Sequence, residues 1–127
     1  MRIEEQVLSR EQMAHLKELG VDTSDASMAW FMSKTKQWKI KVKNNFSHEL
    51  LLRLSPERYI PTYTIGDLEE KLPKIIGSKE LETNFGIKNV GYWTLTEGLY
   101  SVNYKRYIDG LYNLLCWVAK NHKELIK

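Results

Sequence analysis

The sequence has a single cysteine and no long apolar run, and each shortage excludes a class of protein. One cysteine, Cys116, among 127 residues cannot form an intramolecular disulfide or a thiolate zinc cluster, so disulfide scaffolds and zinc ribbons are excluded. The longest unbroken apolar run, residues 114–119, is far too short to span a bilayer, and the first residues lack the apolar stretch of a secretory signal. We therefore predict a cytoplasmic protein without a membrane segment.

The length and composition fit one folded domain over residues 1–127. A chain of this size, 43% hydrophobic, can bury a core without disulfides. The net charge of +3 is small but unevenly spread, because residues 26–63 hold seven basic and two acidic side chains. This segment is therefore the most basic part of the chain.

Hydrophobic spacing in the first half predicts a helix followed by a hairpin. Ser9 and Gln12 have the spacing of a capping box, which places a helix at residues 10–19. Alternating apolar residues predict strands at 28–33 and 38–43, with Trp38, Ile40 and Val42 facing inward. Residues 48–54 are predicted as a third strand, although Ser47 could equally cap a helix there.

The second half predicts two helices and a second hairpin. Thr64 and Asp67 begin a short helix that ends before Pro73, and alternation predicts strands at 92–95 and 99–104. A strand near 81–85 is a further hypothesis. The last helix covers residues 105–123. The resulting fold class is α+β, an antiparallel sheet built from hairpins with three helices packed largely on one face.

One side chain of the last helix is out of register. Apolar residues cover one half of this helix, but Trp117 falls among the polar residues of the other half. An aromatic residue ringed by polar ones is typical of a partner surface, here Gly110, Asn113, Trp117 and Lys120. The alternative hypothesis is that the N-terminal arm, with Ile3, Val7 and Leu8, packs across this face and buries the indole.

A row of lysines is the second candidate surface. Lys34, Lys36, Lys39, Lys41 and Lys43 follow one another without an intervening acid, as in surfaces that bind a phosphate backbone. Lysines are also what the solvent face of an edge strand needs, so this row has a purely structural interpretation. Arginine, which gives bidentate base readout, is absent from the row, so any binding of nucleic acid would be neutral to sequence.

No motif predicts catalysis. His15, His48 and His122 lack the spacing of metal ligands, and Cys116 and His122 lie on different sides of one helix. A cysteine in a hydrophobic helix is typically a buried, inert thiol. We therefore predict that the protein is not an enzyme and has no catalytic residue, cofactor or metal site.

Three groups of segments resemble a known family. They are residues 4–7, 9–12 and 16–21 (EEQV, SREQ, LKELGV), residues 59–65, 67–68 and 72–73 (YIPTYTI, DL, LP), and residues 108–111 and 114–117 (IDGL, LLCW). In these segments the chain is similar to small uncharacterised proteins carried by prophages and mobile elements of Bacteroides-type gut bacteria. The family has no assigned activity, so the resemblance implies a bacterial or phage setting and no mechanism.

The leading functional hypothesis is therefore a non-enzymatic accessory protein of a phage or mobile element. It would act through contact with an unknown protein or through self-association as a homodimer. The alternative is weak, sequence-neutral binding of nucleic acid through the lysine row, and an enzyme of unknown class is a distant third. A pocket with converging polar groups would favour that third hypothesis.

Overall fold

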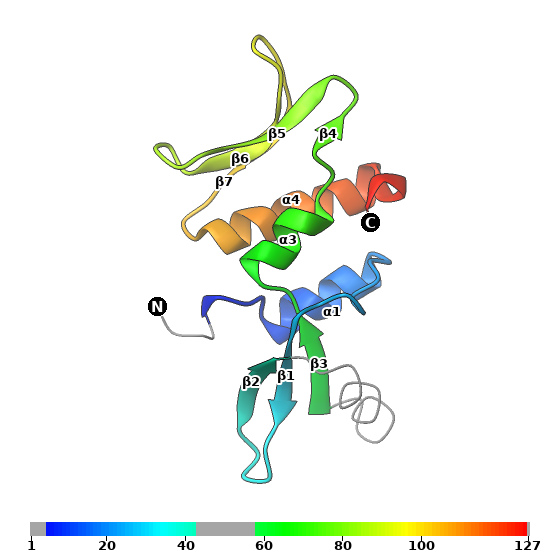
Figure 1. The fold of residues 1–127 in the computed structure, drawn as a ribbon, viewed down its shortest axis with the longest axis vertical. Helices are drawn as coiled ribbons and strands as arrows, with labels where there is room; N and C mark the ends of the chain where they lie inside the picture. Colours follow the sequence, from blue (N-terminus) through cyan, green and yellow to red (C-terminus); the bar gives the residue numbers. More distant parts are fainter. Residues whose placement is uncertain (1–4, 43–57, 127) are drawn as a thin grey trace. The chain divides into compact units, whose positions relative to one another are not determined.

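The computed structural model describes residues 5–42 and 58–126, and the chain divides into two compact units, Met1–Asp67 and Leu68–Lys127. The described residues form three α-helices and two antiparallel sheets (Figure 1). The predicted α+β class is therefore confirmed, with its strands divided between two sheets. That the whole chain is one domain stays a prediction.

Helix α1 (Arg10–Glu18) begins and ends as the sequence indicates. The Gln12 N–H donates to Ser9 Oγ at 3.1 Å, and the Ser9 N–H donates to Gln12 Oε1 at 2.9 Å, so the capping box is confirmed. After the helix, Gly20 has a φ of 86°, and the Val21 N–H donates to Leu16 O at 3.0 Å. Glycine adopts this left-handed conformation without steric cost, which ends the helix here.

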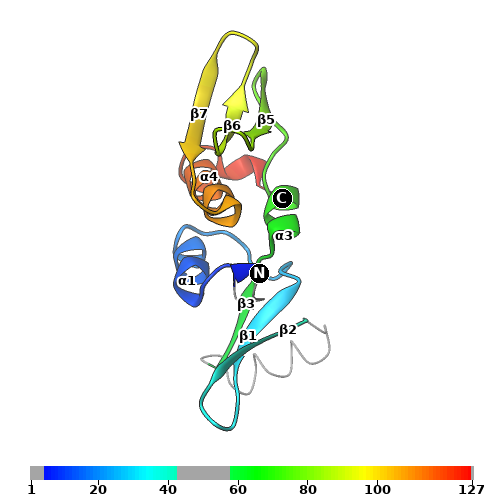
Figure 2. The same ribbon diagram turned by 90° about the vertical axis from the view of Figure 1, so that its left-hand side faces the viewer.

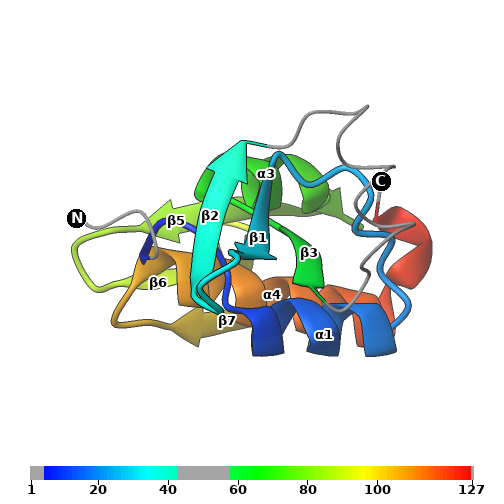
Figure 3. The ribbon, with the colours of Figure 1, turned by 90° about the horizontal axis from the view of Figure 1, so that it is seen from below.

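The sheet of the first unit has the order β2-β1-β3 and is antiparallel throughout. Its strands are β1 (Met28–Met32), β2 (Trp38–Val42) and β3 (Tyr59–Thr62), and Figure 3 shows β1 between the other two. The predicted first hairpin is confirmed, with Met32 opposite Trp38 next to the turn. The predicted strand at 48–54, its helical alternative and Lys43 lie outside the described residues.

One carbonyl ties the N-terminal segment to this sheet. Leu8 O accepts hydrogen bonds from Trp30 Nε1 at 2.8 Å and from Thr62 Oγ1 at 2.7 Å. The Leu8 N–H donates to Tyr63 O at 3.0 Å. The side chains of Leu8 and Tyr63 are fully buried, so this segment forms part of the core of the first unit.

The inward face predicted for β2 is covered in part. Trp38 and Ile40 are half-buried, and the Arg10 guanidinium lies 4.3 Å from the centre of the Trp38 ring. Val42, which we also expected to face inward, is 70% exposed. Val42 is the last residue of an edge strand, where alternation alone does not guarantee a covering layer.

Helix α3 (Ile65–Lys71) has the predicted reciprocal cap. The Asp67 N–H donates to Thr64 Oγ1 at 3.1 Å, and the Thr64 N–H donates to Asp67 Oδ2 at 3.0 Å. The same carboxylate accepts from the Ser27 hydroxyl at 2.6 Å. Pro73 follows the helix, and its missing N–H prevents the helical ladder from continuing.

The second unit holds a sheet of order β4-β5-β6-β7. Its strands are β4 (Ile75–Ile76), β5 (Lys79–Asn84), β6 (Asn89–Trp93) and β7 (Gly98–Asn103). The strand predicted near 81–85 corresponds to β5, and the predicted second hairpin corresponds to β6 and β7. Strand β6 ends two residues earlier than predicted and β7 begins one residue earlier, because the turn already closes at Thr94 and Glu97, and β6 also begins three residues before the predicted position.

Helix α4 (Tyr107–Asn121) runs across one face of this sheet, and the short 3-10 helix η3 (Lys123–Leu125) follows it (Figures 1 and 2). The helix is two residues shorter at each end than the predicted 105–123. Val90 and Tyr92 of β6 are fully buried. The helix buries the apolar stripe expected from its sequence: Ile108, Leu111, Leu114, Leu115, Val118 and Ala119.

Candidate functional site

Trp117 is half-buried, and Tyr100 of β7 covers one face of its indole. The two rings lie 4.5 Å apart between centroids with an interplanar angle of 1°, a stacked pair. The His122 ring lies 5.3 Å from the indole on the C-terminal side of α4. Tyr100 therefore supplies a neighbour that the helical pattern did not reveal. Covering of Trp117 by Ile3, Val7 and Leu8 stays a prediction.

The other residues of the predicted partner surface have different environments. Asn113 and Lys120 are exposed, as expected. Gly110 is buried, and a Cβ at this position would lie 2.7 Å from Tyr104 Cδ2. Gly110 therefore offers no surface to a partner, because the Tyr104 side chain occupies the space beside it.

Strand β7 is an edge of the four-stranded sheet. Its only neighbour among the described strands is β6. In this pairing Val102 lies opposite Val90, Ser101 opposite Gly91 and Tyr100 opposite Tyr92. Six residues long, β7 contains no charged residue and no proline. One full row of its backbone groups therefore faces away from the sheet.

The register shows which groups form that row. The Tyr104 N–H donates to Lys88 O at 2.9 Å, so Tyr104 and Lys88 are a hydrogen-bonded pair. Hydrogen-bonded pairs alternate with non-bonded pairs in an antiparallel ladder, so Val102 and Tyr100 also bond to β6. The backbone N–H and C=O groups of Ser101 and Asn103 consequently point outward from the sheet edge, whereas the register shifts at Leu99, which is an extra residue between Gly98 and Tyr100.

Large apolar side chains are exposed around the same sheet. Leu95 at the tip of the β6–β7 turn is fully exposed, and Trp93 rests on Gly98, where a Cβ would approach the indole Cζ3 to 2.4 Å. Such clustering on one unit is typical of an interaction surface. The exposed apolar residues of this sheet and its turns are Ile75, Phe85, Ile87, Trp93, Leu95 and Leu99.

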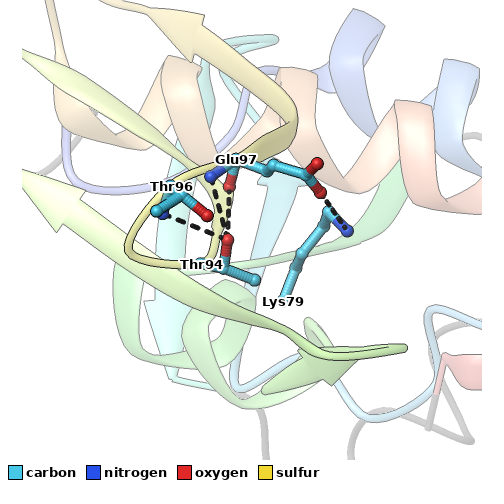
Figure 4. Close-up of polar contacts among 4 residues, drawn as sticks. All are labelled: Lys79, Thr94, Thr96 and Glu97. Carbon is cyan, nitrogen blue, oxygen red and sulfur yellow. Dashed lines mark hydrogen bonds and ion pairs between the residues drawn. The ribbon is translucent and has the colours of Figure 1, made fainter.

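Side-chain hydrogen bonds fix the β6–β7 turn. Thr94 Oγ1 accepts the N–H groups of Thr96 at 3.3 Å and Glu97 at 2.9 Å, and the Thr94 N–H donates to Glu97 O at 2.7 Å (Figure 4). Glu97 Oε2 also lies 3.7 Å from Lys79 Nζ, with the Glu97 side chain 72% exposed. The turn is thus rigid at its base while the Glu97 carboxylate remains open to solvent.

Hollows lie in both units. One, of about 440 Å³, is lined in the first unit by residues of α1, of the segment after it and of β3, among them Met13, Val21 and Tyr59. The other, of about 510 Å³, is lined in the second unit by residues that include Glu82 and Trp93. Within residues 5–42 and 58–126, no three His, Cys, Asp or Glu side chains gather where they could hold a metal ion.

The lysine row lies on the β1–β2 hairpin. Lys34, Lys36 and Lys39 are exposed, whereas Lys41 is half-buried with its Nζ 5.4 Å from the centre of the Phe31 ring. Arg58, which precedes β3, donates through its guanidinium to Ser33 O at 3.3 Å. The structure thus adds an arginine to this basic surface, which the sequence suggested only as a row of lysines.

The candidate reactive side chains are placed as follows. Cys116 is buried, and burial raises the pKa of its thiol, although the nearby Tyr112 hydroxyl and Lys120 partly offset this effect. A raised thiol pKa means little thiolate near neutral pH, so the thiol is a poor nucleophile. His15 lies on α1 and His122 follows α4, while His48 is outside the described residues.

Comparisons with family models, curated proteins and solved structures give no significant match. No helix among the described residues combines the length and apolar character needed to cross a membrane.

Sequence analysis missed two parts of this site, the free edge of β7 and the role of Tyr100. Residues 98–103 contain no charged residue and no proline, which edge strands usually carry to prevent pairing with another strand. This absence indicates an unprotected edge only once the strand order shows that β7 is an edge strand. The stack on Trp117 joins residues 17 positions apart, and no local pattern indicates it.

Proposed function

We propose that this protein is a non-enzymatic module that acts through protein contact, and that β7 with the adjoining Tyr100–Trp117 stack is its contact surface. The observation that carries the proposal is the free edge of β7, with outward backbone groups at Ser101 and Asn103. An extended partner can add to such an edge through main-chain hydrogen bonds. Exposed Leu99 of β7 and exposed Leu95 of the adjoining turn add apolar area to the same surface.

The half-buried stack provides the side-chain part of this surface. Aromatic residues at an interface supply large contact areas at low entropic cost, and Tyr100 and Trp117 already hold each other in place. A partner strand beside β7 would lie next to Tyr100. Trp117 therefore retains the contact role proposed from its sequence position, now through the sheet edge rather than through an exposed helix face.

The setting is part of this proposal. We place the protein in the cytoplasm, as an accessory protein of a phage or mobile element, in line with its single buried cysteine and its sequence resemblance.

Photocrosslinking tests the contact surface. A benzophenone amino acid in place of Leu99 or Leu95, both exposed, is expected to give discrete adducts after irradiation in cells that carry the gene. The same group at Glu18, exposed on α1, is the matched control. Adducts of any protein from positions 95 and 99, and not from position 18, support the proposal. No adducts, or equal adducts from Glu18, would overturn it.

Weak binding of nucleic acid is a second candidate, favoured by the exposed Lys34, Lys36 and Lys39 on one hairpin. It predicts that a labelled single-stranded oligonucleotide binds at low salt and dissociates as salt rises. Replacing Lys39, Lys41 and Lys43 together by glutamine should weaken binding more than replacing Lys17, Lys120 and Lys123. Absent binding at low salt, or equal losses from both triple variants, would refute this candidate.

A further inference from the structure

We propose that the hollow of the first unit binds a small apolar carboxylate, with Arg10 of α1 as the residue that holds its acidic group. The hollow has a volume of about 440 Å³, and small-molecule sites usually span roughly 300–1,000 Å³. It belongs to the first unit, so this inference goes beyond the contact surface proposed for β7 in the second. We assign binding to this hollow and no reaction.

One wall of the hollow is a single face of α1. Its side chains follow one another at steps of three and four residues: Arg10, Met13, Ala14 and Lys17. Such steps place side chains on the same side of a helix. The two apolar residues lie between the two basic ones, which are about 10 Å apart along the helix axis. This face therefore combines an apolar centre with a positive charge at each end.

The segment after α1 and strand β3 supply further apolar lining. Val21 of that segment and Tyr59 of β3 are buried. Ile60 and Pro61, which follow Tyr59 in β3, are half-buried. A hydrocarbon or aromatic body that enters the hollow would thus leave water for apolar contacts on several sides, which favours its binding.

Hydrogen bonds hold these walls in place. Tyr63 directly follows β3, and its hydroxyl lies 2.9 Å from Asp22 O and 2.7 Å from Asp25 Oδ1, which ties the segment after α1 to the end of the strand. The Val21 N–H donates to Leu16 O at 3.0 Å, which ties the same segment to the helix. The hollow is therefore preformed, as small-molecule sites usually are.

The charges around the hollow favour an anionic ligand. Arg10 and Lys17 line it, and within residues 5–42 and 58–126 neither forms an ion pair with a carboxylate. Asp22 is the acidic residue among the described lining residues, and its carboxylate accepts the Ser24 N–H at 3.0 Å. Two basic side chains against one acidic side chain leave the lining positive.

Arg10 is better placed than Lys17 to bind the carboxylate. It is half-buried, and its guanidinium lies 4.3 Å from the centre of the Trp38 ring, a contact that limits its motion. A guanidinium on a ring face still donates through the N–H groups at its edge, in a fork that fits both oxygens of a carboxylate. Lys17 is exposed, so water screens its attraction to a bound anion.

Nuclear magnetic resonance of the isotope-labelled full chain tests the site with sodium decanoate as the probe. Titration from about 10 µM to 5 mM covers the affinities usual for so small a ligand. We expect saturable shifts of the amides of Ala14, Thr23 and Ile60, which line the hollow, and unchanged amides in β5 and β6. Decylammonium has the same chain and the opposite charge, and it should bind at least about tenfold more weakly. Equal binding of the two probes, or decanoate shifts that do not saturate or that lie outside the first unit, would overturn the proposal.

Substitutions separate the charge of the site from its shape. Arg10→Gln should weaken decanoate binding by about tenfold, because a charge-assisted hydrogen bond is lost, and Lys17→Gln by no more than about twofold. Lys39→Gln removes an exposed lysine of β2 and is the matched control, with no change expected. Equal losses from Arg10→Gln and Lys39→Gln would leave no role for Arg10 and overturn the proposal.

Ala14→Leu tests whether the ligand occupies the hollow. Ala14 is exposed on α1, and leucine has nearly the helix propensity of alanine, so an unchanged Tm is expected. The longer side chain extends into the space beside α1 and should weaken decanoate binding by at least about tenfold, since the apolar body no longer fits. Decanoate binding that is indifferent to Ala14→Leu would place the ligand elsewhere and refute the assignment of the hollow.

Discussion

Replacing Gly110 by alanine tests how Tyr104 packs against the first turn of α4. A Cβ at position 110 would lie 2.7 Å from Tyr104 Cδ2 and 3.0 Å from Tyr104 Cβ and Cγ, whereas ordinary contacts begin at 3.4 Å. These atoms lie near the base of the side chain. The Tyr104 N–H donates to Lys88 O at 2.9 Å, so the ring cannot retreat without moving the end of the sheet.

Two effects oppose each other at this position. Alanine is favoured over glycine inside a helix by about 1 kcal/mol. Overpacking a filled site costs about 1–3 kcal/mol. Here three atoms of Tyr104 would have to move away from the added Cβ by several tenths of an ångström. We therefore expect Gly110→Ala to lower the free energy of unfolding by about 1 kcal/mol net, the middle of the range these two effects allow.

Gly66→Ala in α3 is the matched control. Gly66 is exposed, and a Cβ there would meet only Thr64 Oγ1 at 3.8 Å, an ordinary contact. Helix propensity should then act alone and raise stability by a few tenths to about 1 kcal/mol. The same substitution is thus expected to have opposite signs in the two helices.

Thermal and urea unfolding followed by circular dichroism measure both variants. A change of 1 kcal/mol corresponds to about 4 °C in Tm for a domain near this size. A double-mutant cycle with Tyr104→Ala should recover most of the Gly110→Ala loss, because the ring atoms that clash are removed. If Gly110→Ala raises Tm as much as Gly66→Ala does, the packing argument is wrong.

Three further predictions concern the cap, the tyrosines and the thiol. Ser9→Ala should lower the free energy of unfolding by about 1 kcal/mol, and an unchanged urea midpoint would contradict a role for the capping box. Burial raises the pKa of Tyr63 and Tyr92 above 10.0, so the folded state holds these protons longer and its stability should fall as pH rises above about 10. Absorbance at alkaline pH should show these phenols ionising only as the protein unfolds, whereas a normal titration of all tyrosines in folded protein would refute this. Iodoacetamide should modify Cys116 slowly at pH 8 and rapidly in urea, while equal rates would show that the thiol is accessible.

Patterns over a few residues determined much of the local structure. The spacing of Ser9 to Gln12 and of Thr64 to Asp67 predicted both caps, because a cap joins a side chain to a backbone group three residues away. Alternation predicted the β1–β2 hairpin because side chains in strands alternate between faces. The turn of the second hairpin was misplaced, since β6 ends two residues and β7 begins one residue earlier than predicted, because the Thr94 hydroxyl closes the turn early.

The tertiary structure decided everything that depends on distant neighbours. Trp117 looked exposed on a helical wheel, but a strand preceding the helix brings Tyr100 against it. Gly110 looked like surface, but Tyr104 fills its space. The sequence by itself determined the helices, the hairpins and the absence of charge in residues 98–103. Only the order of strands places those residues at an open edge, because the neighbour of each strand depends on packing between all strands of the sheet and not on the sequence of one segment.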